Sequence, residues 1–216
     1  MELDIEKEKQ LAAEAAASLV ESGMRVGLGT GSTVAYLLPA LADRKLVLRC
    51  VATSARTEQA ARQLGIAVEP FTFDRLDIAI DGADQISPEG WLVKGGGSAH
   101  TREKLVAVSA ARFVVIADST KPVTALQAPV PLELLNFGLE STLERLGQVR
   151  LRDVPPSPDG GVIADFMGPI GDPAGLAAWL AATPGVVEHG LFPPEMLSTI
   201  LVGRGESVER IDVARR

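Results

Sequence analysis

The segment LVKGGGSAHTREKL, residues 92–105, carries the side chains that are best suited to chemistry. Lys94 ends a short apolar run, and the three glycines that follow it let the backbone approach a ligand closely. Glu103 falls in the first turn of the helix that the next residues predict, near the positive end of the helix dipole, and exposed glycine amides can bind an oxyanion. A carboxylate in this place can transfer a proton, although it can equally serve only to cap its own helix.

A second glycine-rich turn, GLGTGST, joins an apolar strand to a helix and ends at Thr33. Backbone amides and hydroxyl groups at a helix N-terminus suit a phosphate group. The turn has no lysine after its last glycine, as GxxxxGK[ST] requires, and Ser32 stands where GxGxxG requires a third glycine. Dinucleotide binding is therefore a weak interpretation, and the alternative to a phosphate site is a tight turn that binds nothing.

A pair of carboxylates, Asp81 and Asp84 in the sequence DGAD, ends another apolar strand. Because crowded like charges repel, we expect one aspartate to have a raised pKa and to act as an acid while the other stays ionised. Lys94 is the cation expected to temper that repulsion. The alternatives are a solvated Asp-Gly turn and a magnesium site, since magnesium sites combine carboxylates with substrate phosphates.

Two lysines and the two histidines are weaker candidates. Lys121 closes the segment FVVIADSTK and is expected at the same edge of the sheet, although a single lysine there is more often solvated. Lys9 lies on the polar face of the first helix, where solvation is again the simpler interpretation. His100 and His189 lack the partners that nucleophilic catalysis or a metal cluster needs, so both are expected to be structural.

The order of the expected strands and helices brings these groups to one sheet edge. Strands and helices alternate as far as residue 118, which indicates a Rossmann-like α/β fold, a mostly parallel sheet with helices on both faces. In such sheets ligands bind beyond the carboxyl ends of the strands, where each polar motif above lies. The pattern predicts helices at 5–21, 34–43 and 54–65 and strands at 24–29, 46–52, 66–70, 76–81 and 113–118.

A second unit is expected to begin near residue 125, where several prolines break the alternation. Its order of elements is the split β-α-β-β-α-β of a smaller, ferredoxin-like α+β domain, and a C-terminal hairpin turning at Gly205-Glu206 is expected to return to the first sheet. We therefore expect one domain at 1–125, completed by 203–216, and another at 126–202. The predicted elements of the second unit are strands at 130–134, 148–152, 161–166 and 185–192 and helices at 138–147 and 173–182.

The composition narrows the function classes. The 216 residues include 21 basic and 28 acidic side chains without a lysine or arginine run, which argues against a nucleic-acid or anionic-membrane surface. The single Cys50 excludes an intrachain disulfide, and its apolar neighbours predict a buried core thiol. The N-terminus shows no apolar signal core, and no window approaches the about 20 apolar residues of a spanning helix, so a cytoplasmic location is expected.

Four motifs, GLGTGST, DGAD, KGGGSAHTREK and ADSTK, in this order and at these distances, resemble the type A ribose-5-phosphate isomerases over nearly the whole chain. The resemblance implies interconversion of D-ribose 5-phosphate and D-ribulose 5-phosphate through an ene-diolate, in the non-oxidative pentose phosphate pathway. It also implies a Rossmann-like catalytic domain with a ferredoxin-like lid, no metal or other cofactor, and a homodimer, with a homotetramer as the alternative. His100 and the segment FMGPIGDP depart from the family pattern, which leaves the catalytic residues untouched.

The resemblance also implies a role for individual residues. Glu103 would accept the proton, Asp81 and Asp84 would assist ring opening and proton traffic, and Lys94 with the following glycines would stabilise the oxyanion. The turn from Thr30 to Thr33 would hold the phosphate. The residues expected to bind substrate are Thr30, Gly31, Ser32, Thr33, Asp81, Gly82, Ala83, Asp84, Lys94, Gly95, Gly96, Gly97 and Lys121.

Two rival functions follow from the same motifs. A coenzyme A transferase or an aminosugar-phosphate deaminase shares the implied fold, and a covalent transferase would use Glu103 as a nucleophile and form a thioester on it. A sugar-phosphate sensor without turnover is the rival from another class. It is the weaker of the two, because a sensor has no need of Glu103 and two aspartates beside a phosphate loop.

Overall fold

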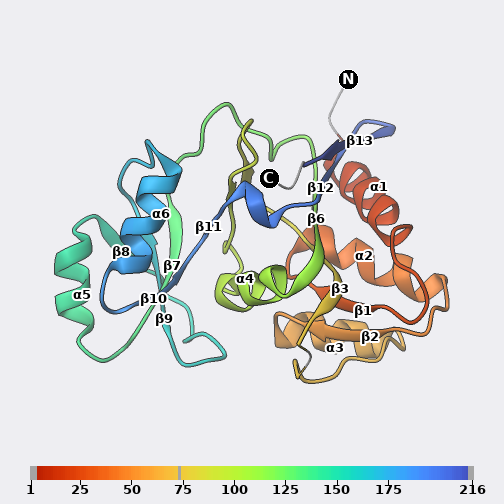
Figure 1. The fold of residues 1–216 in the computed structure, drawn as a ribbon, viewed down its shortest axis with the longest axis horizontal. Helices are drawn as coiled ribbons and strands as arrows, with labels where there is room; N and C mark the ends of the chain where they lie inside the picture. The colour runs from red at the N-terminus through yellow and green to blue at the C-terminus, as the bar shows by residue number, and fades with distance from the viewer. Residues whose placement is uncertain (1–3, 73, 214–216) are drawn as a thin grey trace. The chain divides into compact units, whose positions relative to one another are not determined.

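The computed structural model describes residues 4–72 and 74–213, which form two compact units (Figure 1). The first unit holds Met1–Ala83, Arg102–Lys121 and Glu195–Arg216, and the second unit holds Asp84–Thr101 and Pro122–Pro194. The outer ends of the expected domain ranges, residues 1–3 and 214–216, lie outside the described residues.

These units differ from the expected ranges 1–125 and 126–202 in two segments. Residues 84–101 belong to the second unit because strands β4 (Gln85–Ile86) and β5 (Leu92–Val93) form a sheet with β11 (Leu191–Phe192). Residues 195–202 belong to the first unit because β12 (Thr199–Arg204) pairs with β6 (Ala110–Ala117). In both cases strand pairing between distant segments decides the division, and a scan along the chain does not reveal such pairing.

A six-stranded sheet forms the centre of the first unit, in the order β13-β12-β6-β3-β1-β2 (Figure 1). Neighbouring strands are parallel except for β12 and β13, which form the C-terminal hairpin. The predicted mostly parallel sheet and the return of the hairpin to it are therefore confirmed. The strands not yet bounded are β1 (Arg25–Leu28), β2 (Arg49–Ala52), β3 (Leu76–Asp81) and β13 (Ser207–Asp212).

Helices cover both faces of this sheet. On one face, side chains at alternate strand positions, among them Val26 and Ile78, join a core with α1 and α2. On the other face, a Cβ atom added to Gly27 would come within 2.4 Å of the Cγ1 atom of Val106, so α4 packs closely against β1. The helices of this part of the chain are α1 (Ile5–Ala17), α2 (Ser32–Asp43), α3 (Ala55–Gln63) and α4 (His100–Val108).

One predicted strand, 66–70, is not formed. Val68 makes a single parallel bridge with Cys50 at the edge of the sheet, and the pairing stops there. Pro70 has no amide hydrogen, so it cannot extend a hydrogen-bonded ladder. Cys50 itself is fully buried, and this burial, followed by the charge of Glu69, raises the pKa of the thiol to about 12, which confirms the predicted core thiol.

The second unit contains a four-stranded antiparallel sheet in the order β10-β7-β9-β8. Two helices connect its strands in the order β-α-β-β-α-β, which confirms the predicted ferredoxin-like topology. Leu132, Leu134 and Leu180 lie in its core and are fully buried. Its elements are β7 (Val130–Leu134), α5 (Leu139–Leu146), β8 (Val149–Leu151), β9 (Val162–Phe166), α6 (Pro173–Ala182) and β10 (Val186–His189).

A small sheet, β11-β5-β4, was not predicted, because strands of two residues leave no periodic pattern. The predicted strand 185–192 is divided at Gly190 into β10 and β11. The amide of Gly190 donates to the carbonyl of Pro131 at 2.7 Å, and a Cβ atom here would lie 2.1 Å from the carbonyl oxygen of Lys94. Only glycine allows this close crossing of the two segments. Within the described part of the chain, no helix is both long and apolar enough to cross a membrane.

Candidate active site

The loop from Gly29 to Thr33 connects β1 to α2 in the first unit. A Cβ atom on Gly29 would lie 2.0 Å from the carboxyl carbon of Asp81, so only glycine lets the loop approach this carboxylate. Gly31 adopts φ 139° and ψ 175°, a region that is essentially restricted to glycine. Glycine is therefore required at the two positions for different reasons. At Gly29 there is no space for a side chain, and at Gly31 the backbone conformation excludes other residues.

The start of α2 can accept an anion. Gly31 is its N-cap residue and supplies no side chain, and the first intrahelical bond runs from the Ala35 amide to the Gly31 carbonyl at 3.1 Å. The amides of Ser32 and Thr33 precede that bond, so they belong to the donors that a helix leaves without an internal partner. Gly31 and Ser32 are exposed to solvent, whereas Thr33 is 7 % exposed. Together with the helix dipole, these donors suit a phosphate group.

The hydroxyl of Thr30 points into the protein. Its Oγ1 atom lies 2.8 Å from Thr53 Oγ1, 2.9 Å from Ser54 Oγ and 3.3 Å from Thr57 Oγ1, and the Thr57 hydroxyl in turn donates to the Gly29 carbonyl at 2.9 Å. These hydroxyls lie at the end of β2 and the start of α3. Thr30 therefore anchors the loop, and Ser32 and Thr33 are the hydroxyl residues at the helix start.

Asp81 supports the same loop from the end of β3. Its Oδ1 atom accepts hydrogen bonds from the amide of Thr30 at 3.0 Å and from the amide of Gly82 at 2.7 Å. The residue is 3 % exposed. A nearly buried carboxylate that receives two backbone amides is fixed in orientation, so Asp81 and the GTGST motif form one structure.

Glu103 lies at the same edge of the first unit. β3 and β6 are parallel neighbours, and the chain between them returns along α4, so the first turn of α4 faces the edge where β3 ends. Glu103 is in that first turn, as predicted, and is 4 % exposed. It precedes Val106 by three residues and therefore shares the helix face that packs against β1.

Lys121 follows β6 at this edge, in a turn that a distant helix holds. Glu8 of α1, 1 % exposed, accepts hydrogen bonds from the amide of Ser119 at 2.9 Å and from the amide of Gly205 at 2.8 Å. Burial alone would raise the pKa of the Glu8 carboxyl, but the hydrogen bonds from Gly205 and Ser119 outweigh it and lower the pKa below its ordinary value. Lys9, next to it, forms an ion pair with Glu6 at 2.7 Å.

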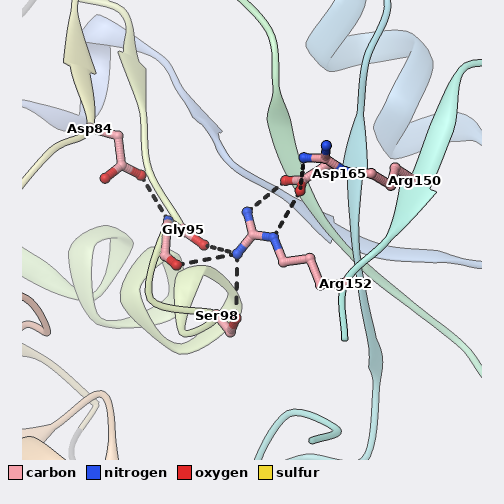
Figure 2. Close-up of polar contacts among 7 residues, drawn as sticks. Asp84, Gly95, Ser98, Arg150, Arg152 and Asp165 are labelled. Carbon is pink, nitrogen blue, oxygen red and sulfur yellow. Dashed lines mark hydrogen bonds and ion pairs between the residues drawn. The ribbon is translucent and has the colours of Figure 1, made fainter. Parts of the chain in front are cut away.

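In the second unit, the glycine loop, residues 95–97, is bonded on two sides (Figure 2). The amide of Gly96 donates to Asp84 Oδ2 at 2.8 Å, and the carbonyl of Gly95 accepts from Arg152 Nη1 at 2.8 Å. Gly95 has φ 109°, and a Cβ atom there would lie 2.8 Å from both Pro131 Cβ and His100 Nδ1. His100 is fully buried and lies next to Gly95.

Lys94 precedes this loop in the second unit. The residue is 2 % exposed, its amide donates to the Gly190 carbonyl at 2.8 Å, and its ammonium group lies 5.5 Å from the centre of the Phe192 ring. The backbone is thereby fixed against β11, and the aromatic face attracts the charge. Lys94 is a positioned cation and not the solvated lysine of an ordinary surface.

The predicted site residues thus fall into two sets, one in each unit. Gly82 and Ala83 follow β3 directly, at the end of the first segment of the first unit. His189 is buried in β10 of the second unit. Among the residues that the structure describes, no group of three or more histidine, cysteine or acidic side chains is placed to hold a metal ion. The first set is Thr30, Gly31, Ser32, Thr33, Asp81, Glu103 and Lys121, and the second set is Asp84, Lys94, Gly95, Gly96 and Gly97.

Comparisons with known proteins agree with one family. Residues 49–207 match the family model of ribose 5-phosphate isomerase A, also called phosphoriboisomerase A. Ribose-5-phosphate isomerase A of Caulobacter sp. (strain K31) is 43 % identical over 97 % of this chain and 99 % of its own length. The protein of the same name from Methanosarcina acetivorans is 46 % identical over 86 % of both chains.

The chain belongs to the ribose 5-phosphate isomerase A family. Two solved structures agree with this assignment. Ribose 5 phosphate isomerase A from Neisseria gonorrhoeae has a TM-score of 0.90 at 30 % identity and covers 95 % of this chain and 96 % of its own. A D-ribose-5-phosphate isomerase in complex with phospho-erythronic acid has a TM-score of 0.91 at 31 % identity, covering 97 % of this chain and 100 % of its own. The family predicted from the four motifs is therefore confirmed.

Several residues that support the site of this family member were not found from the sequence. Arg152 and Asp165 hold the glycine loop, Glu8 holds the turn before Lys121, and Glu133 accepts hydrogen bonds from Thr101 and Ser157. Each of these contacts joins segments far apart in the chain, so no local motif contains both partners. The only available signal was the presence of charged residues within strands that were otherwise expected to be apolar, such as Glu133 and Asp165 in VPLEL and VIADF.

Proposed function

We propose that Glu103 carries the proton in the reaction of this enzyme. As a member of its family the chain is an aldose-ketose isomerase that interconverts D-ribose 5-phosphate and D-ribulose 5-phosphate. In the open-chain aldose, Glu103 takes the proton from carbon 2, and the electron pair of that bond forms the double bond of an ene-diolate while the carbon 1 carbonyl becomes an oxyanion. Return of the proton to carbon 1, with transfer of the carbon 2 hydroxyl proton to the carbon 1 oxyanion, completes the ketose.

The observation that carries this proposal is the place of Glu103. It is an almost buried carboxylate at the positive end of α4, on the sheet edge that also holds Asp81 and the start of α2. A general base in such a position typically contributes about 100- to 10,000-fold to the rate.

The Gly29–Thr33 loop would bind the phosphate. Amides at the start of α2 and the hydroxyls of Ser32 and Thr33 are suited to its oxygens, with Lys121 as a further cation at the same edge. The solved relative that contains phospho-erythronic acid binds a compound with both a phosphate and a carboxylate. Its phosphate corresponds to the phosphate of the substrate, and its carboxylate corresponds to the oxyanion that forms at the sugar carbons.

Lys94 and the glycine loop would stabilise that oxyanion, and Asp81 and Asp84 would assist ring opening and proton transfer. The ammonium group of Lys94 and the glycine amides supply the donors that developing charge requires. Asp84 accepts the Gly96 amide, so its carboxylate also orients the loop. In this division of work the first unit is the catalytic domain and the ferredoxin-like part of the second unit is the lid.

We also propose a homodimer in the cytoplasm. The single cysteine, Cys50, is a buried free thiol, so the fold does not depend on an intrachain disulfide. This suits a reducing compartment. Phe137, in the loop after β7, is 94 % exposed, and its neighbour Leu135 is 51 % exposed. Large apolar side chains exposed to this degree are suited to contact with a second subunit.

The test is isomerisation of D-ribose 5-phosphate in deuterated water, followed by NMR of the product. Proton transfer through an ene-diolate predicts solvent deuterium at carbon 1 of D-ribulose 5-phosphate, and the rate should persist after exhaustive chelation. A product that keeps all of the original carbon 2 hydrogen at carbon 1 would instead indicate a hydride shift and overturn the role of Glu103. Loss of turnover with EDTA, restored by magnesium or manganese, would overturn the metal-free mechanism.

A further inference from the structure

Arg152 contacts two carbonyl groups of the glycine loop in the second unit (Figure 2). Its Nη1 atom lies 2.8 Å from the Gly95 oxygen and 3.3 Å from the Gly96 oxygen, with Ser98 Oγ at 3.4 Å. The residue directly follows β8, and its side chain is 16 % exposed. One guanidinium nitrogen therefore faces two successive peptide groups of the loop that is proposed to stabilise the oxyanion.

Peptide geometry gives these contacts a consequence for the loop amides. In a planar trans peptide, the carbonyl and the following N–H point in opposite directions. The Gly95 carbonyl points to Arg152, and the Gly96 amide accordingly points the other way, to Asp84. By the same rule, a Gly96 carbonyl turned toward Arg152 makes the Gly97 amide point away from Arg152, on the side where Asp84 lies. Glycine peptides rotate easily, so this orientation needs a fixed partner.

Arg152 is itself fixed by Asp165. Nε and Nη2 of Arg152 lie 3.0 Å and 2.6 Å from the two carboxylate oxygens of Asp165, a bidentate pair in which the aspartate side chain is 5 % exposed. Asp165 lies in β9, and the Arg152 amide donates to the Ile163 carbonyl at 3.0 Å, so both partners are on sheet backbone. Arg150 reaches the same carboxylate at 3.4 Å, but its side chain is 64 % exposed and contacts no loop carbonyl in Figure 2.

We propose that Arg152, oriented by Asp165, is a positioning residue that keeps the Gly96 amide on Asp84 and turns the Gly97 amide toward the substrate oxyanion. The inference rests on the proposed role of that loop. Arg152 does not touch the reacting atoms; it acts through the Gly95 and Gly96 peptides. The structure thus assigns part of the transition-state stabilisation to an arginine that lies 57 residues after Gly95 in the chain.

The first experiment compares Arg152→Ala with Arg150→Ala, a matched change of an arginine on the same aspartate. Loss of a whole oxyanion donor costs about 100- to 1,000-fold in other enzymes, and a misdirected donor retains part of its effect. We expect the kcat of Arg152→Ala to fall about 10- to 100-fold with KM changed less than about 3-fold, and Arg150→Ala to behave like the parent. In Arg152→Ala, the Ki of phospho-erythronic acid should rise as kcat falls. The Ki of inorganic phosphate should stay constant.

A double variant separates positioning from fold stability. Arg152→Ala leaves the nearly buried Asp165 with only the exposed Arg150, so the melting temperature should fall. Adding Asp165→Asn removes that unbalanced charge and should recover most of the melting temperature without recovering kcat. Millimolar guanidinium should raise the kcat of Arg152→Ala several-fold and leave Arg150→Ala unchanged.

The outcomes distinguish this proposal from the proposed function. If the parent protein does not isomerise D-ribose 5-phosphate, the proposed function fails. If the parent and Arg150→Ala turn over and Arg152→Ala equals them, only the role of Arg152 is overturned. Recovery of kcat together with melting temperature in the double variant would also overturn it, because a purely structural arginine behaves in that way.

Discussion

Two glycine-rich loops carry the proposed chemistry, and they are held in different ways. The Gly29–Thr33 loop of the first unit is anchored by Asp81 and by hydroxyls at the next strand-to-helix turn. The glycine loop, residues 95–97, of the second unit is anchored by Asp84 on one side and by Arg152 on the other. The first loop is thus built from neighbouring strand ends of one parallel sheet, whereas the second depends on a partner from a separate sheet.

This difference matches the work proposed for each loop. A phosphate carries its charge throughout the reaction, so a helix start with several donors can bind it without exact placement of any one of them. An oxyanion exists only near the transition state, and its donors must already point at it. A loop with that task needs its peptide planes fixed from both sides, and Arg152 with Asp84 meets this need.

The largest expected effect comes from Glu103→Gln, which removes the base and leaves both loops intact. Turnover of D-ribose 5-phosphate should fall by at least about 100-fold, in line with the usual contribution of a general base, with KM nearly unchanged. Steady-state kinetics beside Glu89→Gln, an exposed glutamate of the second unit, provide the measurement and its control. A Glu103→Gln enzyme that kept more than about a tenth of the parent rate would rule out this base.

Gly29→Ala tests the packing of the first loop against Asp81. The added Cβ would lie 2.0 Å from the Asp81 carboxyl, so the loop or the carboxylate must move. We expect kcat/KM to fall more than about 30-fold and the melting temperature to fall by several degrees, since forcing extra atoms into a packed site typically costs about 1–3 kcal/mol.

The double variant Gly29→Ala, Asp81→Ala is the control for that change. Removing the carboxylate relieves the clash, so the melting temperature should rise again while activity stays low. If the single variant had parental activity and stability, the close approach of Gly29 to Asp81 would be incorrect.

Thr33→Val separates a phosphate site from a tight turn. Loss of one hydroxyl that bonds a charged group costs roughly 1.5 to 3 kcal/mol, and part of that binding energy supports the reaction at the distant carbons. The kcat/KM of the variant for D-ribose 5-phosphate should fall several-fold or more. Its already low kcat/KM for unphosphorylated ribose should scarcely change. Kinetics on both sugars test this expectation, and an equal loss on the two would place the phosphate elsewhere.

The first loop could be predicted from the sequence because its determinants are local. Gly29, Gly31 and the hydroxyls follow one strand directly, and Asp81 ends the next strand inward in the sheet, so strand-end reasoning brought them together. Arg152 could not be predicted in the same way. It lies in a segment with prolines and charged residues, and its partner Asp165 becomes adjacent only when β8 and β9 pair. The same reason explains why the pairing of the two-residue strand β5 with β4 and β11 was not predicted.

The smallest effect on activity is expected from Glu8→Gln, which tests whether distant support also matters in the first unit. Glu8 joins α1 to the turn before Lys121 and to the C-terminal hairpin. Loss of charge-assisted hydrogen bonds at this buried site should lower the free energy of unfolding by roughly 1 to 2 kcal/mol at pH 7, because glutamine keeps one acceptor. The kcat should stay within about 2-fold of the parent, and Glu14→Gln, an exposed change on the same helix, should alter neither quantity.

The stabilisation by Glu8 should depend on pH in a defined direction. The pKa of Glu8 is lowered in the folded protein from an ordinary value of 4.5, so its contribution to stability is complete above that value and is lost as the pH falls through the lower, folded-state pKa. The melting temperatures of the parent and of Glu8→Gln should therefore differ by a constant amount from pH 8 to about pH 5 and converge below pH 4.5. A gap that stayed constant down to pH 3 would mean that the ionised carboxylate is not what holds the turn. In that case the turn before Lys121, like the Gly29–Thr33 loop, would not depend on a distant charge. The contrast with the second loop, which Arg152 holds, would then include this turn as well.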